Sequence, residues 1–414
     1  MWKRWQAITL WKRILGSLLL GVVLGAAFKA AGLEAFGAAL EPVGKLFINA
    51  IKMLMVPIVF VTIVAGVTAL QQATRLGRMA LRTIALYFFT TACAVTIGLV
   101  IANLLEPGRG ITLPQTDGAT AKTLSLKDVI VGLIPPNPVA AMANGEVLPL
   151  IVFAILLGLA INAAGRSAQP LKELFDAANA AIMKLVHFVM EAAPFGIFAL
   201  VLWVIAELSV TELMRLMLVV VTLYLACLLQ IGIVYTGLLT VLGRLSPKRF
   251  FQGIIDAQAV AFTTSTSAGT LPVTMANVED NLGVSRKVAS FVLPLGATMN
   301  MDGTAIYMGI AAVFTAQALG IDLTTGQYAT IVLTGTLASI GAASIPSAGL
   351  IIMPVVLSSV GLPLGAIALF FPIDRIMDMM RTMTNVTGDA TVAVLVADAE
   401  GELDRKRFTA APVE

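Results

Sequence analysis

Charged and amide side chains recur at a helical spacing in the apolar segment 367–397. Residues 374, 378, 381, 385 and 389 follow one another at intervals of 4, 3, 4 and 4, so they share one helix face. Three acids, an arginine and an asparagine in a row cannot face lipid, because polar groups at membrane depth are costly. Arg381 can hold a carboxylate through two parallel hydrogen bonds, while Asp378, one turn earlier, can hold an ammonium. The pattern favours a site for an amino acid with a second acid group; a purely structural ion-pair network is the alternative.

A second polar cluster interrupts the apolar segment 288–319. It supplies Thr298, Asn300, Asp302 and Thr304 around a glycine, and the segment 80–104 adds Tyr87, Thr90 and Thr91. Carboxylate, amide and hydroxyl oxygens are hard ligands that suit a small cation. The cluster therefore predicts a Na⁺ site.

Two further stretches, 252–275 and 329–357, are apolar but broken. Each contains a run of small residues that reaches a proline, in 263–272 and in 339–349. Two helix-breaking tips in oppositely oriented units point to an inverted repeat with a binding site near the middle of the membrane. Non-helical backbone at that depth must be buried in protein or line a cavity. Two kinked helices are the alternative.

The composition requires a membrane protein built of helices. The 414 residues are 58% hydrophobic and only 12% charged, with a mean hydropathy of +0.93, whereas soluble domains carry about 25% charged residues. The net charge of +3 is too small to suggest a nucleic-acid partner. Cys93 and Cys227 lie inside apolar runs, and the single histidine, His187, excludes a histidine-clustered metal centre.

Apolar segment length predicts eight spans, since a bilayer core needs roughly 20 apolar residues per helix. The segments are 14–32, 43–70, 80–104, 129–162, 181–206, 214–242, 288–319 and 367–397. The Lys/Arg clusters all fall on the N-terminal side if both broken stretches enter and leave the membrane on one side. We therefore expect a multi-pass protein of the cell membrane, with a retained first helix, both termini cytoplasmic and an external loop at 105–128.

At these residues the chain closely resembles the dicarboxylate/amino acid:cation symporter family, which includes archaeal aspartate transporters and excitatory amino acid transporters. The resemblance implies an all-α membrane protein with eight transmembrane helices, two re-entrant helical hairpins, inverted repeats, a homotrimer and an elevator motion. It divides the chain into scaffold or trimerisation parts at 1–79 and 129–213, and transport-domain parts at 80–128 and 214–414. The motifs that carry it are the serine-rich run of the first hairpin, Asn300 to Thr304, Ile345-Pro346, and Asp378, Arg381, Thr382, Asn385 and Asp389.

The resemblance also implies residue roles. Arg381 would bind the side-chain carboxylate of the substrate and Asp378 its amino group. The rest of the substrate site would comprise Thr304, Ser267, Thr382 and Asn385, with backbone at Ser265 and Ile345. The Na⁺ sites would comprise Asp389, Asn385 and the backbone of Asn300; Thr298 with the backbone of Ser339, Ile340 and Ala342; and Asp302 with Tyr87, Thr90, Thr91 and Asn300.

Three positions depart from the pattern of particular family members. Ser265 stands where archaeal members carry an arginine, and Met379 stands where excitatory transporters carry one; Arg375 is the candidate replacement. Met308 stands where excitatory transporters carry a glutamate used in proton coupling.

The sequence thus predicts a Na⁺-coupled importer of L-aspartate or L-glutamate without enzymatic activity. Proton- or Na⁺-coupled C4-dicarboxylate carriers and neutral amino-acid carriers of the same fold are the alternatives. Asp378 argues against the first, and Arg381 argues against the second. An intramembrane hydrolase that uses Ser267 would lack a His or Lys base at hairpin spacing. Mixed charges on one helix face do not suit a channel filter.

Overall fold

The computed structural model describes residues 10–33, 39–74, 77–111, 131, 134–207, 210–340 and 347–410. Within these ranges the chain is almost entirely helical and contains no strand, only an isolated bridge between Val284 and Leu403. This agrees with the all-α class expected for a membrane transporter.

The helices follow one another along the chain with few long connections. The N-terminal half contains α2 (Leu10–Ala30), α4 (Glu41–Thr74), α5 (Arg78–Leu105), α7 (Pro138–Asn144), α8 (Val147–Ala164), α9 (Gln169–Glu207) and α10 (Val210–Leu229). A π-helical turn, η2 (Gln230–Tyr235), joins α10 to α11 (Thr236–Val241). The remainder contains α12 (Pro247–Gly253), α13 (Ile255–Thr264), α14 (Ser267–Ala276), α15 (Arg286–Met299), α16 (Asp302–Ala318), α17 (Thr325–Ile340), α18 (Ala348–Ser359), α19 (Phe371–Glu400) and α20 (Arg405–Thr409).

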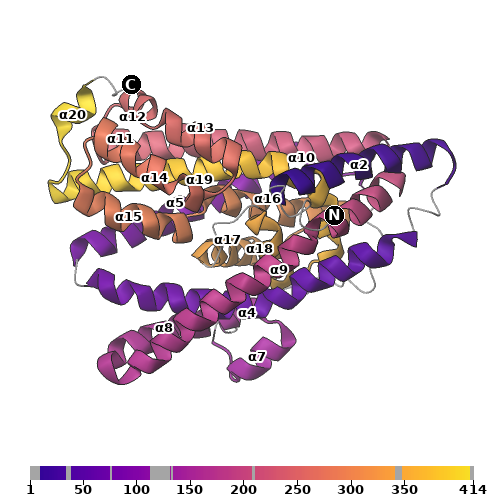
Figure 1. Cartoon of the computed structure of the whole chain (residues 1–414), viewed down its shortest axis with the longest axis horizontal. Helices are drawn as coiled ribbons and strands as arrows, with labels where there is room; N and C mark the ends of the chain where they lie inside the picture. Colours follow the sequence, from indigo (N-terminus) through magenta and orange to yellow (C-terminus); the bar gives the residue numbers. More distant parts are fainter. Residues whose placement is uncertain are drawn as a thin grey trace, which may run out of the picture.

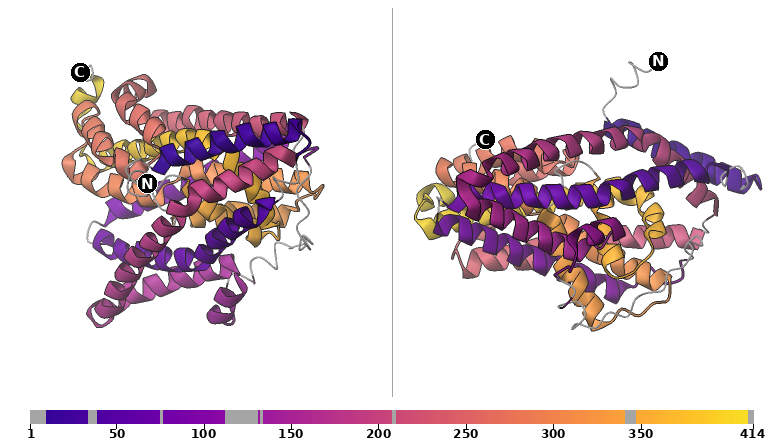
Figure 2. Two further views of the ribbon diagram at one scale, coloured as in Figure 1. Left: turned by 45° about the vertical axis from the view of Figure 1, so that its right-hand side comes forward. Right: turned by 90° about the horizontal axis from the view of Figure 1, so that it is seen from below.

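The helices form two groups by their contacts. One group contains α2, α4, α8 and α9, and the other contains α5 and the helices from α10 to α19. In Figure 1, α13, α14, α15 and α19 lie at the upper left, while α4, α7 and α8 lie at the bottom. The two further views in Figure 2 show the same long helices crossing one another. The groups meet chiefly where α17 and α18 pack against α4 and α8.

Three helices in the described part of the chain are long and apolar enough to cross a membrane, judged by length and composition. They are Arg78–Leu105, Pro149–Leu185 and Met214–Val241. Four shorter apolar helices accompany them, at Leu19–Ala30, Val56–Thr68, Glu191–Trp203 and Ala348–Ser359. The count of eight spans stays a prediction. α19 is not among these helices, and its Asp374, Asp378, Arg381 and Asp389 are buried within the protein.

Several expected segments are broken. The expected span 288–319 divides into α15 and α16 at Asn300 and Met301, and 129–162 divides into α7 and α8 at Gly145, whose φ is 68°. The first broken stretch forms the pair α13 and α14, which turns at Ser265 with a left-handed φ of 54°. The second forms α17 and α18, and its tip at 341–346 lies outside the described residues.

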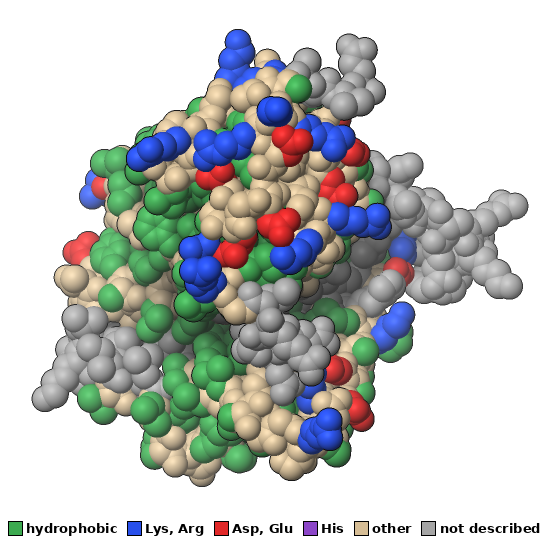
Figure 3. Space-filling view, turned by 90° about the vertical axis from the view of Figure 1, so that its left-hand side faces the viewer, with side chains coloured by type: hydrophobic (Ala, Val, Ile, Leu, Met, Phe, Trp, Pro, Cys, Tyr) green, Lys and Arg blue, Asp and Glu red, His purple; other side chains and the backbone are tan. Residues whose placement is uncertain are grey.

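Charged side chains gather on the end of the molecule where α12 and α20 lie (Figure 3). Arg405 pairs with Asp398, Arg407 with Asp280, and Lys287 with Glu402, at 2.7, 3.3 and 2.9 Å. The hydrogen bond from Lys287 lowers the pKa of Glu402 below its usual value. These pairs tie the segment after α19 to the base of the first hairpin and to the start of α15.

Two glycines allow α5 and α16 to cross closely. A Cβ on Gly98 would lie 2.5 Å from the carbonyl oxygen of Ile306, and a Cβ on Gly309 would lie 2.9 Å from that of Val95. Small residues at helix crossings let backbones approach, which is a main source of packing energy in membrane proteins. This crossing brings the hydroxyls of α5 toward the start of α16.

We expect Gly98→Ala to destabilise the protein by about 1–3 kcal/mol, because the methyl group must push two backbones apart. The apparent unfolding temperature of the detergent-solubilised protein, read from tryptophan fluorescence, measures the effect. Gly237→Ala is the matched control, since a Cβ there meets nothing within 4 Å. Equal unfolding temperatures for Gly98→Ala and the control would contradict the close crossing.

Candidate functional site

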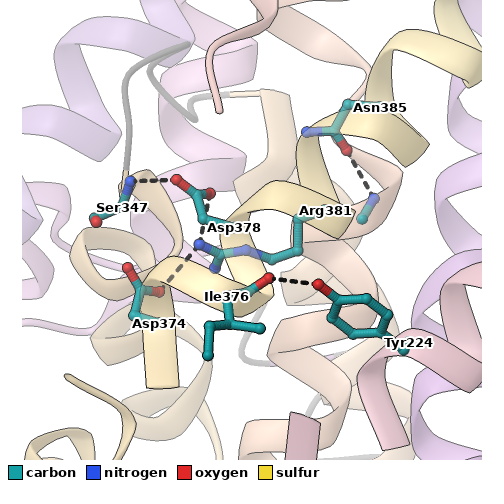
Figure 4. Close-up of polar contacts among 8 residues, drawn as sticks. Tyr224, Ser347, Asp374, Ile376, Asp378, Arg381 and Asn385 are labelled. Carbon is teal, nitrogen blue, oxygen red and sulfur yellow. Dashed lines mark hydrogen bonds and ion pairs between the residues drawn. The ribbon is translucent and has the colours of Figure 1, made fainter. Parts of the chain in front are cut away.

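Arg381 is the centre of a buried charge cluster on α19. Its side chain is 0% exposed, and its Nη2 donates to Oδ1 of Asp378 at 2.7 Å and to Oδ1 of Asp374 at 3.0 Å (Figure 4). Both carboxylates are also buried. One guanidinium therefore faces two acids inside the protein, so the cluster carries one net negative charge when all three groups are ionised.

The guanidinium keeps further donors. Among the described residues, Nε and Nη1 of Arg381 are buried without a hydrogen-bond partner, as are Oδ2 of Asp374 and the hydroxyl of Tyr307. The guanidinium carbon lies 4.3 Å from the centre of the Tyr307 ring, in cation–π geometry. Unpaired buried donors on a cation are expensive, and a carboxylate oxygen is a strong acceptor for either of them. The chemistry of the cluster thus fits an anionic ligand.

Asp378 also joins α19 to the second hairpin. Its Oδ2 accepts a hydrogen bond from the backbone N–H of Ser347 at 2.9 Å, just before α18 begins (Figure 4). Ser347 has a left-handed φ of 62°, so the chain bends sharply there. Of the residues expected at this tip, Ile345 and Ala342 lie outside the described residues, as does the side chain of Ile340.

The tip of the first hairpin is also packed against α19. Ser265 is buried and its hydroxyl has no hydrogen-bond partner among the described residues, while Ser267 begins α14 and is buried as well. The free N–H groups at the start of a helix favour negative charge. Arg375, the candidate for the missing second arginine, donates from Nη2 to the carbonyl of Thr263 at 3.2 Å. It therefore contacts the end of α13.

Asn385 connects α19 to the start of α16. Its Oδ1 accepts from the backbone N–H of Gly303 at 2.7 Å. Thr304, the next residue of α16, is buried, and so is Thr382 on α19. The side chains of the expected substrate site that the structure describes thus come from α14, α16 and α19, with Ser265 at the turn before α14.

The acids expected to bind Na⁺ lie in a second buried cluster. Thr91 donates to Oδ1 of Asp302 at 2.7 Å, and Asn300 donates from Nδ2 to Oδ1 of Asp389 at 3.0 Å. Thr90 donates to Oδ1 of Asn300 at 3.2 Å, which links the two acids through neutral groups. Among the described residues no group of three or more His, Cys, Asp or Glu side chains could hold a metal ion. Carboxylate, hydroxyl and amide oxygens are suited to a hard cation rather than to a transition metal.

The remaining expected Na⁺ ligands lie in different surroundings. Tyr87, Thr91 and Ser339 line one small cavity between α5 and α17. Thr298, in contrast, is exposed on α15, and its hydroxyl donates to the carbonyl of Leu295 at 3.0 Å. Ser339 donates to the carbonyl of Thr336 at 2.7 Å.

The sequence alone gives no binding role to Asp374, Tyr307, Gln230 or Tyr235. Asp374 lies on the polar face that the sequence predicts for α19. Gln230 and Tyr235 both donate to Asp302 from η2. Polar side chains inside an apolar span indicate a functional site, so Gln230 and Tyr235 could have been found from the sequence. Residues five apart do not share a face of an α-helix, so the sequence pattern does not place these two side chains together.

Comparison with known proteins decides the family. The family model described as "Sodium:dicarboxylate symporter family" matches residues 10–399. The chain belongs to this family. The resemblance drawn from the motifs is thereby confirmed.

Several curated members of the sodium:dicarboxylate symporter family are similar over nearly the whole chain. The Proton/glutamate-aspartate symporter of Escherichia coli (strain K12) is 34% identical over 384 residues, which cover 90% of this chain and 87% of that protein. The Proton/sodium-glutamate symport protein of Bacillus subtilis (strain 168) is 33% identical over 399 residues, or 94% and 92% of the two chains. The C4-dicarboxylate transport protein of Laribacter hongkongensis (strain HLHK9) is 34% identical over 412 residues, or 97% and 92%.

In this member of the symporter family, Gly349 on α18 allows a direct test of how closely the second hairpin packs against Arg381. A Cβ at Gly349 would collide with Nη1 of Arg381. We expect Gly349→Ala to destabilise the protein by about 1–3 kcal/mol, and we expect this loss to disappear in an Arg381→Ala background. Unfolding of the four proteins in detergent completes the double-mutant cycle. Additive losses would show that Gly349 and Arg381 do not touch.

Proposed function

We propose that this protein is a secondary active transporter that couples the inward movement of Na⁺ to the uptake of L-aspartate or L-glutamate. The observation that carries the proposal is the buried Arg381 with unused donors, next to two carboxylates. The proposal includes no catalytic step.

The charge cluster on α19 supports a substrate with both signs of charge. Nε and Nη1 of Arg381, which have no partner among the described residues, lie on different edges of the guanidinium, and either can donate to the side-chain carboxylate of the substrate. Asp378, which shares Arg381 with Asp374, would hold the substrate ammonium. The main-chain carboxylate would lie near Ser267 at the start of α14, with Thr304, Thr382 and Asn385 around it.

The oxygen cluster around Asp302 and Asp389 supports Na⁺ as the coupled ion. Each acid is buried and bonded only to neutral side chains among the contacts described above. A buried carboxylate without a cationic side chain beside it must bind a cation or take up a proton. The hydroxyl, amide and carboxylate oxygens gathered here suit a hard cation such as Na⁺. Cation binding would therefore remove a large electrostatic penalty from the transport cycle.

A C4-dicarboxylate remains the second candidate substrate. One relative of similar identity is named a C4-dicarboxylate transport protein. A dicarboxylate such as succinate has no ammonium, so it would leave Asp378 without a substrate partner. The pairing of one cation with two acids in this chain favours the amino acid.

The two helix groups support an elevator mechanism in which one group moves against the other. The scaffold parts 1–79 and 129–213 contain α2, α4, α8 and α9, while 80–128 and 214–414 contain the helices around both clusters. We extend the proposal to a homotrimer in the cell membrane with eight spans, two re-entrant hairpins and cytoplasmic termini. Crosslinking in native membranes tests the trimer.

Proteoliposome uptake tests the proposed transport reaction. An inward Na⁺ gradient should drive accumulation of radiolabelled aspartate or glutamate without internal K⁺ and without an inward proton flux. Met308 cannot titrate, so α16 offers no proton carrier one turn beyond Thr304. Excess succinate should compete weakly. Aspartate-dependent acidification of the lumen would contradict Na⁺-only coupling, and strong succinate competition would favour the dicarboxylate.

Arg381→Cys tests the assignment of the substrate carboxylate. Removing one partner of a buried ion pair costs about 3–5 kcal/mol, so aspartate affinity should fall by about two to four orders of magnitude. The variant should instead accept serine, which lacks the second acid. Arg286→Cys is a suitable control because Arg286 is exposed at the start of α15. Unchanged aspartate affinity in Arg381→Cys would remove Arg381 from the substrate site.

A further inference from the structure

Gln230 and Tyr235, at the two ends of η2, contact Asp302 in the oxygen cluster, here called the cation cluster, which also contains Asp389. The hydroxyl of Tyr235 donates to Oδ2 of Asp302 at 2.7 Å and to the carbonyl of Thr384 at 3.2 Å. Nε2 of Gln230 donates to the same Oδ2 at 3.2 Å and to the carbonyl of Thr90 at 3.0 Å. Both side chains are fully buried.

The π-helical turn η2 explains how both side chains reach one oxygen. Residues five apart in an α-helix lie about 140° from each other around the axis, so they point in different directions. In η2 the backbone N–H of Thr236 donates to the carbonyl of Ile231, five residues earlier. Such i→i+5 bonding adds a residue to the turn and brings residues five apart into line. Gln230 and Tyr235 therefore face the same way.

The hydrogen bonds of Gln230 and Tyr235 make the two oxygens of Asp302 inequivalent, because both bonds go to Oδ2 and neither goes to Oδ1. Oδ2 is taken by two donors, and an amide NH₂ such as that of Gln230 has no lone pair to offer a cation. Oδ1 accepts only from the hydroxyl of Thr91 among the bonds described. A hydroxyl can rotate and present its lone pairs, so Thr91 can change from donor to cation ligand. The open side of the carboxylate thus faces α5.

We propose that η2 makes Gln230 and Tyr235 the positioning residues that set cation selectivity at Asp302, by fixing Oδ2 so that only Oδ1 coordinates the ion. This inference rests on the proposed Na⁺ coupling. Selectivity between hard cations depends on cavity size, ligand number and ligand flexibility. A carboxylate held by two donors is a rigid ligand, whereas one released from them can turn to fit ions of other radii.

Tyr235→Phe tests the positioning role without requiring transport. The rise in unfolding temperature of the detergent-solubilised protein is titrated with NaCl and with LiCl, at constant ionic strength in choline chloride and without amino acid. We expect the half-saturating Na⁺ concentration to rise about tenfold, as for loss of one hydrogen bond to a charged group. We also expect the ratio of Li⁺ to Na⁺ half-saturating concentrations to move toward one. Gln230→Leu should shift both quantities in the same direction.

Tyr224→Phe is the matched control. Tyr224 lies on α10, and its hydroxyl donates to the backbone carbonyl of Ile376 at 3.0 Å (Figure 4). Tyr224→Phe removes a phenolic hydroxyl, as Tyr235→Phe does, together with a hydrogen bond to α19. The hydroxyl of Tyr224 donates to Ile376 and not to Asp302. It should titrate with Na⁺ and Li⁺ as the unmodified protein does.

The possible outcomes separate the two proposals. If the unmodified protein shows no stabilisation by Na⁺, the proposed Na⁺ coupling is wrong. If it responds to Na⁺ while Tyr235→Phe and Gln230→Leu titrate as it does, the positioning role is wrong and Na⁺ coupling stands. Weaker Na⁺ binding with an unchanged Li⁺ to Na⁺ ratio would also overturn the selectivity role. Should Tyr235→Phe fail to fold, Gln230→Leu, which keeps the Tyr235 hydroxyl, decides the question.

Discussion

The contact of one buried guanidinium with two buried carboxylates constrains the rest of this structure. Removing such ions from water costs several kcal/mol per ion, and their mutual attraction offsets this cost only when protein surrounds them closely. Arg381, Asp374 and Asp378 lie on a helix in an otherwise apolar chain, so lipid cannot cover this face. Both hairpins and α16 cover it instead.

The covering elements are broken helices, and α19 completes their ends. Asn385 accepts from the N–H of Gly303 in the first turn of α16, and Asp378 accepts from the N–H of Ser347 just before α18. N–H groups at a helix start have no partner within the helix, so they must find one elsewhere when buried. Side chains of α19 thereby hold the helix breaks that surround Arg381. A change in the partner of Asp378 alters the anchoring of the second hairpin at the same time.

The charge cluster around Arg381 and the oxygen cluster around Asp302 and Asp389 are separate but adjoining parts of one polar interior. Asn300 bridges Asp389 and Thr90, and Gln230 bridges the carbonyl of Thr90 and Asp302. The start of α16 contributes Asp302 to the oxygen cluster, while the next residues, Gly303 and Thr304, meet α19. A shift of this helix start would therefore move side chains in both clusters, which gives a short physical route for coupling between them.

The sequence by itself determined the class of protein, the polar face of α19, the oxygen-rich cluster before α16 and the two broken stretches. Each of these follows from local composition or from a regular helical period, and both can be read from the linear sequence. The pairing of Arg381 with Asp374, the π-helical turn at Gln230 and Tyr235, and the exposed position of Thr298 were decided only by the tertiary structure. These depend on which helices pack against one another and on a local departure from the α-helical period, because a five-residue spacing has no common face until the turn widens to create one.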